Sequence, residues 1–122
     1  MEQEYIKGDI VMYDNKIHTI MDTLGVNNYE LSYIEHPVHQ LELSGVLLTP
    51  EILEKNKWRK TKESFKTQSY YKKNFGVNVM TIITINGYCS VVYNITHIRY
   101  IQYVHELQHL LFGLGLNSEM EV

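Results

Sequence analysis

The strongest constraint on the fold lies between residues 77 and 95, where an apolar run meets a tight-turn signal. The run VNVMTIITI is rich in β-branched residues, which favour a strand. It is followed by Asn86-Gly87, the dipeptide that best fits a two-residue hairpin turn. Residues 88–95 then return as a partner strand. The second half of the chain is therefore predicted to contain an antiparallel hairpin.

The first half of the chain indicates several short strands separated by turn signals such as Asp14-Asn15. In one strand Ile17, Thr19 and Met21 alternate onto one side, and in another Leu31 and Tyr33 share a face. Closely spaced short strands predict a small antiparallel β-barrel or bent sheet, with an SH3-like arrangement among the options. The predicted strands cover residues 9–13, 16–21, 29–34, 40–43 and 46–48.

Two helices complete the predicted fold. Thr49 is a good N-cap and Pro50 fits the first helical position, so a short helix is expected to end near Asn56. A longer C-terminal helix is expected over residues 98–112. Its core-facing stripe has helical spacing and comprises Tyr100, Val104, Leu107, Leu111 and Leu114. The expected class is α+β, as a single domain over residues 1–122.

Length and composition favour a small cytoplasmic protein. A chain of 122 residues fits one domain, and no apolar run approaches the ~20 residues that span a bilayer. The polar N-terminus does not resemble a secretory signal, and Cys89 has no partner for an internal disulfide. No membrane partner is expected.

The charges are strongly segregated. Residues 1–54 carry 2 basic and 10 acidic side chains, whereas residues 55–73 carry 8 basic and 1 acidic. Aromatic residues interrupt the basic segment, so cations could neutralise phosphates while rings stack on bases. The alternative is a solvated loop with Trp58 and Phe65 packed in the core. The candidate ligand-binding residues are Lys57, Trp58, Arg59, Lys60, Lys62, Tyr70 and Tyr71.

Residues 105–109 read HELQH, which matches the H-E-x-x-H pattern of zinc peptidases. Two histidines four residues apart on a helix can bind one zinc, and the Glu can act as general base. His105, His109 and Glu106 would take these roles. The pattern lacks an obvious third ligand, although His36 and His39 lie upstream. The helical stripe also predicts that both histidines point away from the core, so no cofactor is expected.

Tyrosines and the C-terminal helix suggest an interface. Ile101 and Phe112 form a second apolar stripe on the expected helix, and an exposed stripe of this kind favours a homodimer. Tyr100 and Tyr103 are further interface candidates, as are Tyr70 and Tyr71. Four other tyrosines are interpreted as half-buried strand residues: Tyr13, Tyr29, Tyr33 and Tyr93.

Two segments carry a resemblance to known proteins. Residues 103–112, YVHELQHLLF, and the segment LTPEIL followed by Trp58 resemble motifs of a loose group of small uncharacterised proteins. These are encoded by gut anaerobes, their mobile elements and their phages. The group's closing helix typically reads V-H-x-L-Q-N, with Asn where this chain has His109, and ends in T-G, which is absent here. The resemblance covers about half of the chain and implies an accessory protein of a phage or mobile element.

The sequence thus leads to a non-enzymatic binding protein in a bacterial host cytoplasm. Its partner would be a host protein or a small anionic ligand of the nucleotide type. The resemblance implies inhibition of a host process such as antiviral defence. The first alternative is a minimal zinc hydrolase built on His105, His109 and Glu106. The second is a nucleic-acid-binding module that uses residues 55–73.

Overall fold

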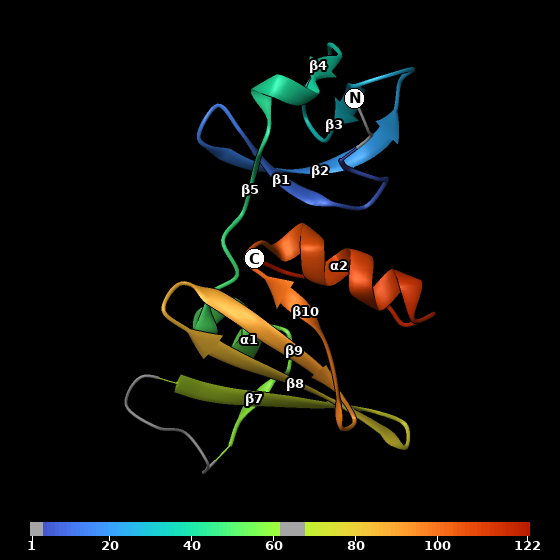
Figure 1. Cartoon of the computed structure of the whole chain (residues 1–122). Coiled ribbons are helices and arrows are strands. Elements are labelled where there is room, and N and C mark those ends of the chain that lie inside the picture. Colours follow the sequence, from blue (N-terminus) through green and yellow to red (C-terminus); the bar gives the residue numbers. More distant parts are fainter. Residues whose placement is uncertain (1–3, 62–67) are drawn as a thin grey trace. The chain divides into compact units, whose positions relative to one another are not determined.

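The computed structural model describes residues 4–61 and 68–122, which form two compact units (Figure 1). Unit 1 comprises Met1–Leu47 and Tyr103–Glu119, and unit 2 comprises Leu48–Gln102 and Met120–Val122. In chain order unit 2 is therefore inserted into unit 1. The predicted α+β class is confirmed, because each unit contains an antiparallel sheet and an α-helix.

The sheet of unit 1 has five short antiparallel strands in the order β4-β3-β2-β1-β5. A 3-10 helix, Gln40–Glu42, lies where a strand over residues 40–43 is predicted. The third strand also ends earlier than predicted, because Tyr33 adopts a left-handed φ of 63° that a strand does not allow. The strands are β1 (Ile10–Tyr13), β2 (Lys16–Thr23), β3 (Asn28–Leu31), β4 (Val38–His39) and β5 (Ser44–Gly45).

One face of this sheet forms the core of unit 1. The buried cluster comprises Tyr5, Val11, Ile20, Tyr29, Leu31 and Val38. Strand β2 contributes the side that holds His18 and Ile20, both buried. The opposite side of β2 carries Ile17 and Met21, which remain 46% and 48% exposed. Period-two alternation is therefore present as predicted, but the more apolar side of β2 faces solvent.

The C-terminal helix α2 (Val104–Gly113) belongs to unit 1 and starts later than predicted. Three members of the predicted stripe, Val104, Leu107 and Leu111, are buried as expected. His105 is also buried, at 5% exposure, so the prediction that it points away from the core is wrong. The buried arc is wider than the stripe because the N-terminal segment of unit 1 lies against this side of the helix, as the hydrogen bonds below show.

Unit 2 contains the predicted hairpin. Asn86 and Gly87 both have positive φ, 42° and 88°, as a two-residue hairpin turn between β8 and β9 requires. Its sheet has the order β10-β9-β8-β7-β6, with every neighbouring pair antiparallel. The elements are α1 (Pro50–Lys55), β6 (Arg59–Lys60), β7 (Gln68–Phe75), β8 (Asn78–Ile85), β9 (Tyr88–Tyr93) and β10 (Thr96–Ile101).

Two strands of unit 2 correct the sequence interpretation. Strand β7 begins within the basic segment 55–73, for which a solvated loop is one of the two sequence interpretations, yet its eight residues all pair with β8. Strand β10 lies where the C-terminal helix is predicted to begin. Residues 96–101 include β-branched and aromatic side chains, and pairing with β9 supplies the backbone hydrogen bonds that a helix would otherwise provide.

The inner face of the unit 2 sheet packs against α1 (Figure 1). Tyr71, Ile82 and Val91 are buried on this face, and α1 contributes Leu53 to the buried residues. Burial raises the pKa of the Tyr71 hydroxyl, and Glu54 and Glu51 of the helix raise it further. The residues that alternate with Tyr71, Ile82 and Val91 along their strands point to the opposite face of the sheet.

Cys89 is buried in unit 2, and burial raises the pKa of its thiol to about 11. Within the described ranges, no helix is long and apolar enough to cross a membrane.

Glycine substitutions test the packing of unit 1. A Cβ on Gly45 would lie 2.6 Å from the Tyr103 ring, whereas a Cβ on Gly113 would meet no atom within 4 Å. We expect Gly45→Ala to lower the free energy of unfolding by about 1–3 kcal/mol through overpacking. Gly113→Ala should raise it by about 0.5 kcal/mol, because alanine favours the helix. Urea unfolding of both variants measures the difference, and equal stabilities would contradict the packing described.

Candidate functional site

The HELQH segment occupies the first half of α2, and its side chains make structural contacts within unit 1. Glu106 Oε1 accepts a hydrogen bond of 3.0 Å from the backbone N–H of Tyr103, so this carboxylate caps the helix. The predicted general base thus acts as a helix cap in this structure.

Gln108 joins α2 to the N-terminal segment. Its Oε1 accepts a hydrogen bond of 2.9 Å from the N–H of Ile10, and its Nε2 donates to the carbonyl of Gly8 at 2.9 Å. The same amide donates to the carbonyl of Ser118 at 3.1 Å. Gln108 is buried, so the side chain pairs backbone groups that would otherwise be costly to bury.

His109 extends this connection through Asp9. Its Nε2 lies 2.6 Å from Asp9 Oδ2, and the carboxylate is almost fully buried. Asp9 Oδ2 also accepts a hydrogen bond from the N–H of Ile6 at 2.9 Å. The second histidine of the motif therefore holds a buried carboxylate of the same unit.

His105 is packed among aromatic rings. Its ring centroid lies 4.9 Å from that of Tyr5 and 5.8 Å from that of Tyr103, which it stacks against. Its Nδ1 is buried and has no hydrogen-bond partner among the described residues. Burial lowers the pKa of this imidazole, and the neighbouring His109 lowers it further while Asp9 opposes the shift. The neutral form is therefore favoured in the folded protein.

The described residues contain no group of three or more His, Cys, Asp or Glu side chains placed to hold a metal ion. The two upstream histidines make local contacts instead. His39 Nδ1 accepts a hydrogen bond from the N–H of Leu41 at 3.1 Å, and His36 Nδ1 lies 3.1 Å from the carbonyl of Pro37. His105 and His109 thus lie close together, but among the described residues neither His36 nor His39 joins them in a group of metal ligands.

The predicted ligand-binding residues are divided between the core and the surface of unit 2. Trp58 and Tyr71 are buried, at 3% and 2% exposure, so their rings are not available for stacking on a ligand. Arg59 and Lys60 are exposed on β6, and Lys57 is exposed with a left-handed φ of 71°. Tyr70 is half-buried on β7, and Lys62 lies outside the described residues.

The outer face of the unit 2 sheet collects side chains from four strands into one row. Cross-strand pairing links Tyr70 to Ile83, Ile83 to Ser90, and Ser90 to Tyr100. Residues paired directly across strands point to the same side, so these four share the face opposite α1. The row crosses β7, β8, β9 and β10.

An aromatic cluster stands at the β9–β10 end of this row. The ring centroids of Tyr88 and Tyr100 lie 5.5 Å apart, and those of His97 and Tyr100 lie 4.8 Å apart. Tyr88 and Tyr100 are 42% and 59% exposed, which leaves their rings open to a planar ligand. Tyr88 and His97 are not among the residues predicted from the sequence, because a helix is predicted over residues 98–112 and local sequence does not reveal the pairing of β9 with β10.

Two cations occupy the other end of the same face. Arg59 pairs directly with Lys72, and the row continues from Lys72 through Thr81 and Val92 to His97. Like charges directly opposite each other disfavour strand pairing, and the two cations give this end of the face a positive charge. Lys60 pairs with Tyr71, so its side chain points to the other face of the sheet. We call this surface, comprising Arg59, Lys72, Tyr70, Tyr88, His97 and Tyr100, the tyrosine face.

The predicted interface residues do not form one stripe. Tyr100 and Ile101 lie on β10 of unit 2, where Tyr100 is exposed and Ile101 is buried. Phe112 lies on α2 of unit 1 and is 66% exposed, and Tyr103 precedes that helix with intermediate exposure. The prediction of a second helical stripe is therefore wrong, because Ile101 belongs to a strand of unit 2 and Phe112 to a helix of unit 1.

Protonation of His105 provides a test of its burial. In the unfolded chain this imidazole binds a proton as the pH falls below its ordinary pKa of about 6.5. In the folded chain the pKa is lowered, so the proton binds less readily and protonation favours the unfolded state. We therefore expect the free energy of unfolding to fall between pH 7.5 and pH 5.5, with a slope of at most about 1.4 kcal/mol per pH unit. His105→Phe should flatten this dependence and the exposed His36→Gln should not, as measured by urea unfolding. An unchanged slope in His105→Phe would show that the imidazole titrates normally.

Metal analysis tests the zinc alternative. We expect the purified protein to carry no stoichiometric zinc, because His109 Nε2 is paired with Asp9 and Glu106 caps the helix. Elemental analysis after purification without chelators measures this directly. About one zinc per chain, lost in His109→Ala, would contradict the expectation and favour a zinc hydrolase.

No protein-family model, no curated protein and no solved structure matches this chain.

Proposed function

We propose that the protein is a non-enzymatic binding protein that uses the tyrosine face of unit 2 to bind a phosphate-bearing ligand of the nucleotide type. The observation that carries the proposal is the combination of exposed rings and cations on one sheet face. Tyr88, His97 and Tyr100 offer surfaces for base stacking, and Arg59 and Lys72 offer charge for phosphates. Every base can stack on an aromatic ring, so we expect the protein to select nucleotide-type ligands as a class and not a particular base sequence.

The dimensions of the sheet favour a short single-stranded nucleic acid over a single nucleotide. The cations lie on β6 and β7, and the aromatic cluster lies on β9 and β10. Strands in a sheet are about 4.8 Å apart, so about 14 Å separates β7 from β10. An extended strand of two or three nucleotides spans that distance. A mononucleotide would contact only one end of the face.

The charge of unit 2 agrees with an anionic ligand. Residues 48–102 carry 9 basic and 3 acidic side chains, and residues 120–122 add one acidic side chain, which gives 9 − 4 = +5. The resemblance to small proteins of phages and mobile elements supports an accessory role in a host cytoplasm. In that role the protein would sequester its ligand from a host process such as antiviral defence. A homodimer could not use the predicted stripe as a whole, because Ile101 is buried, and exposed Phe112 is then the stripe residue available for such a contact.

Neighbouring residues on β6 provide a matched test. Arg59→Glu removes a cation from the tyrosine face. Lys60→Glu makes the same charge change on a neighbouring side chain that points to the other face of the sheet. We expect Arg59→Glu to weaken binding of a fluorescein-labelled oligothymidylate about tenfold and Lys60→Glu to weaken it far less. Tyr100→Ala should weaken binding by about 1–3 kcal/mol through lost stacking. Fluorescence anisotropy at low and moderate salt measures all four proteins.

The same series includes its own stability control. Arg59→Glu faces Lys72 and replaces a like-charge pair by an opposite-charge pair, so it should stabilise the fold by about 0.2–1 kcal/mol. Loss of binding in this variant therefore could not be attributed to unfolding. Equal weakening by Arg59→Glu and Lys60→Glu would point to bulk charge alone. Tight binding of a mononucleotide, unaffected by Tyr100→Ala, would move the site away from this face.

A further inference from the structure

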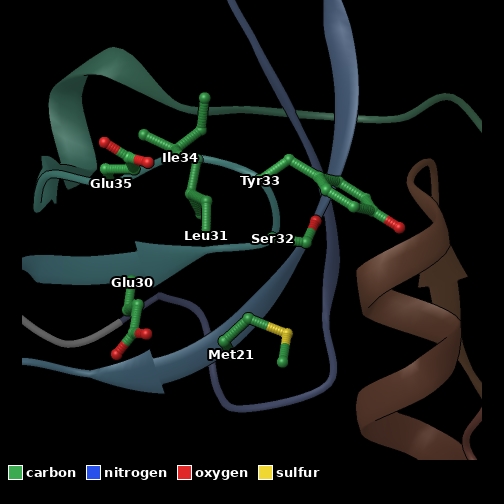
Figure 2. Close-up of a pocket in the computed structure, with 7 residues that line it drawn as sticks. All are labelled: Met21, Glu30, Leu31, Ser32, Tyr33, Ile34 and Glu35. Atoms are coloured by element: carbon green, nitrogen blue, oxygen red, sulfur yellow. The ribbon is translucent and has the colours of Figure 1, made fainter.

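Unit 1 carries two adjoining hollows beside β2 and the segment that follows β3, and both are lined by Tyr33 and Ile34. Figure 2 shows the residues that line the first. The first is lined by Met21 and residues 30–35. The second is lined by Tyr13, Asp14, Lys16, Ile17 and His18 together with the two shared residues. We call the surface formed by Ile17, Met21, Glu30, Tyr33, Ile34 and Glu35 the Tyr33 saddle.

The apolar part of the saddle is exposed. Ile17 and Met21 are about half exposed on β2, although the same strand buries His18 and Ile20 on its other side. Tyr33 is 98% exposed, so its ring contributes little to the stability of the fold. Large apolar side chains grouped around a hollow are typical of a surface that binds another protein.

The backbone holds Tyr33 in an unfavourable conformation. Its φ of 63° lies in the left-handed region, where a bulky residue is a steric outlier. The preceding residue fixes the turn, because Ser32 Oγ accepts a hydrogen bond from the N–H of Thr19 and the N–H of Ser32 donates to the Thr19 carbonyl, each at 3.0 Å. A glycine or asparagine would fit this position with less strain. An exposed, strained tyrosine is the kind of outlier that points to a binding role.

Carboxylates surround the larger hollow. Glu30 and Glu35 line it, and Asp22 pairs directly with Glu30 across β2 and β3 as a like-charge pair. Figure 2 shows Glu35 and Glu30 on opposite sides of the β3 ribbon, with Tyr33 apart from both. Residues 1–47 and 103–119 together carry 10 acidic and 2 basic side chains, so unit 1 has a net charge of 2 − 10 = −8. This charge repels nucleic acid and favours a cationic partner.

We propose that the Tyr33 saddle binds an extended, arginine-containing segment of another protein. A guanidinium stacks on the exposed face of the Tyr33 ring, and others pair with the Glu30 and Glu35 carboxylates through paired hydrogen bonds. Apolar side chains of the same segment enter the hollows beside Met21 and Ile17. Because the Tyr33 ring and the two carboxylates lie apart from one another along the lining of the hollow, the partner must be a segment of several residues. This site is independent of the ligand proposed for unit 2.

A labelled peptide tests the proposal directly. The probe is a fluorescein-labelled nine-residue peptide in which Arg and Leu alternate, with a Glu–Leu peptide of the same length as the opposite-charge control. We expect the Arg–Leu peptide to bind the full-length protein at low salt and the Glu–Leu peptide not to bind. Tyr33→Gly should weaken binding about tenfold while raising the melting temperature, because glycine relieves the left-handed strain. Fluorescence anisotropy and thermal unfolding measure the two effects.

A charge-matched pair of variants separates the saddle from bulk attraction. Glu30→Gln/Glu35→Gln and Glu4→Gln/Glu119→Gln each remove two exposed carboxylates of unit 1. The first pair should weaken binding about tenfold and the second should leave it within a factor of two. Equal weakening by both pairs, unchanged binding by Tyr33→Gly, or no binding of the Arg–Leu peptide would each overturn the proposal. If light scattering shows wild-type dimers that Tyr33→Gly dissolves, the occupant is a second copy of this chain and the proposed partner is wrong.

Discussion

The buried amide of Gln108 is the contact on which the architecture of unit 1 depends. It pairs with backbone groups of Gly8 and Ile10, which lie about a hundred residues earlier in the chain. Ile10 is the first residue of β1, so the amide fixes the start of the sheet against α2. His109 and Asp9 reinforce the same junction. Because an unpaired buried amide would cost free energy, this network also specifies which segment α2 packs against.

This dependence explains why α2 can match a catalytic sequence motif although the motif's side chains serve to pack the helix within unit 1. His105, Glu106 and His109 fit the spelling of a zinc site, but each is engaged in packing, capping or pairing within unit 1. The surfaces with unexplained chemistry lie elsewhere, on sheet faces that no short motif marks. The tyrosine face contains one like-charge pair directly across two strands, Arg59 with Lys72, and Glu30 of the Tyr33 saddle belongs to another, with Asp22. Such pairs oppose stability, and their opposite signs follow the segregation of charge between the units.

The two proposals give the chain two surfaces of opposite chemistry. The tyrosine face presents rings and cations, and the Tyr33 saddle presents rings, apolar side chains and carboxylates. A protein with both could hold an anionic ligand and a cationic protein segment at the same time.

Local chemistry in the sequence determined the Asn86-Gly87 hairpin, the capped start of α1 at Thr49 and the burial of Val104, Leu107 and Leu111, because each depends on neighbouring residues. Charge counts likewise located the cations of β6 and β7. Tertiary structure decided the rest. Residues 68–75 and 96–101 are strands because β8 and β9 supply their hydrogen-bond partners, and no local period reveals that pairing. His105 is buried because a distant segment covers it, and Tyr100 joins Tyr88 and His97 only through strand register. Contacts between residues far apart in the chain cannot be read from local periodicity, and these contacts form both candidate surfaces.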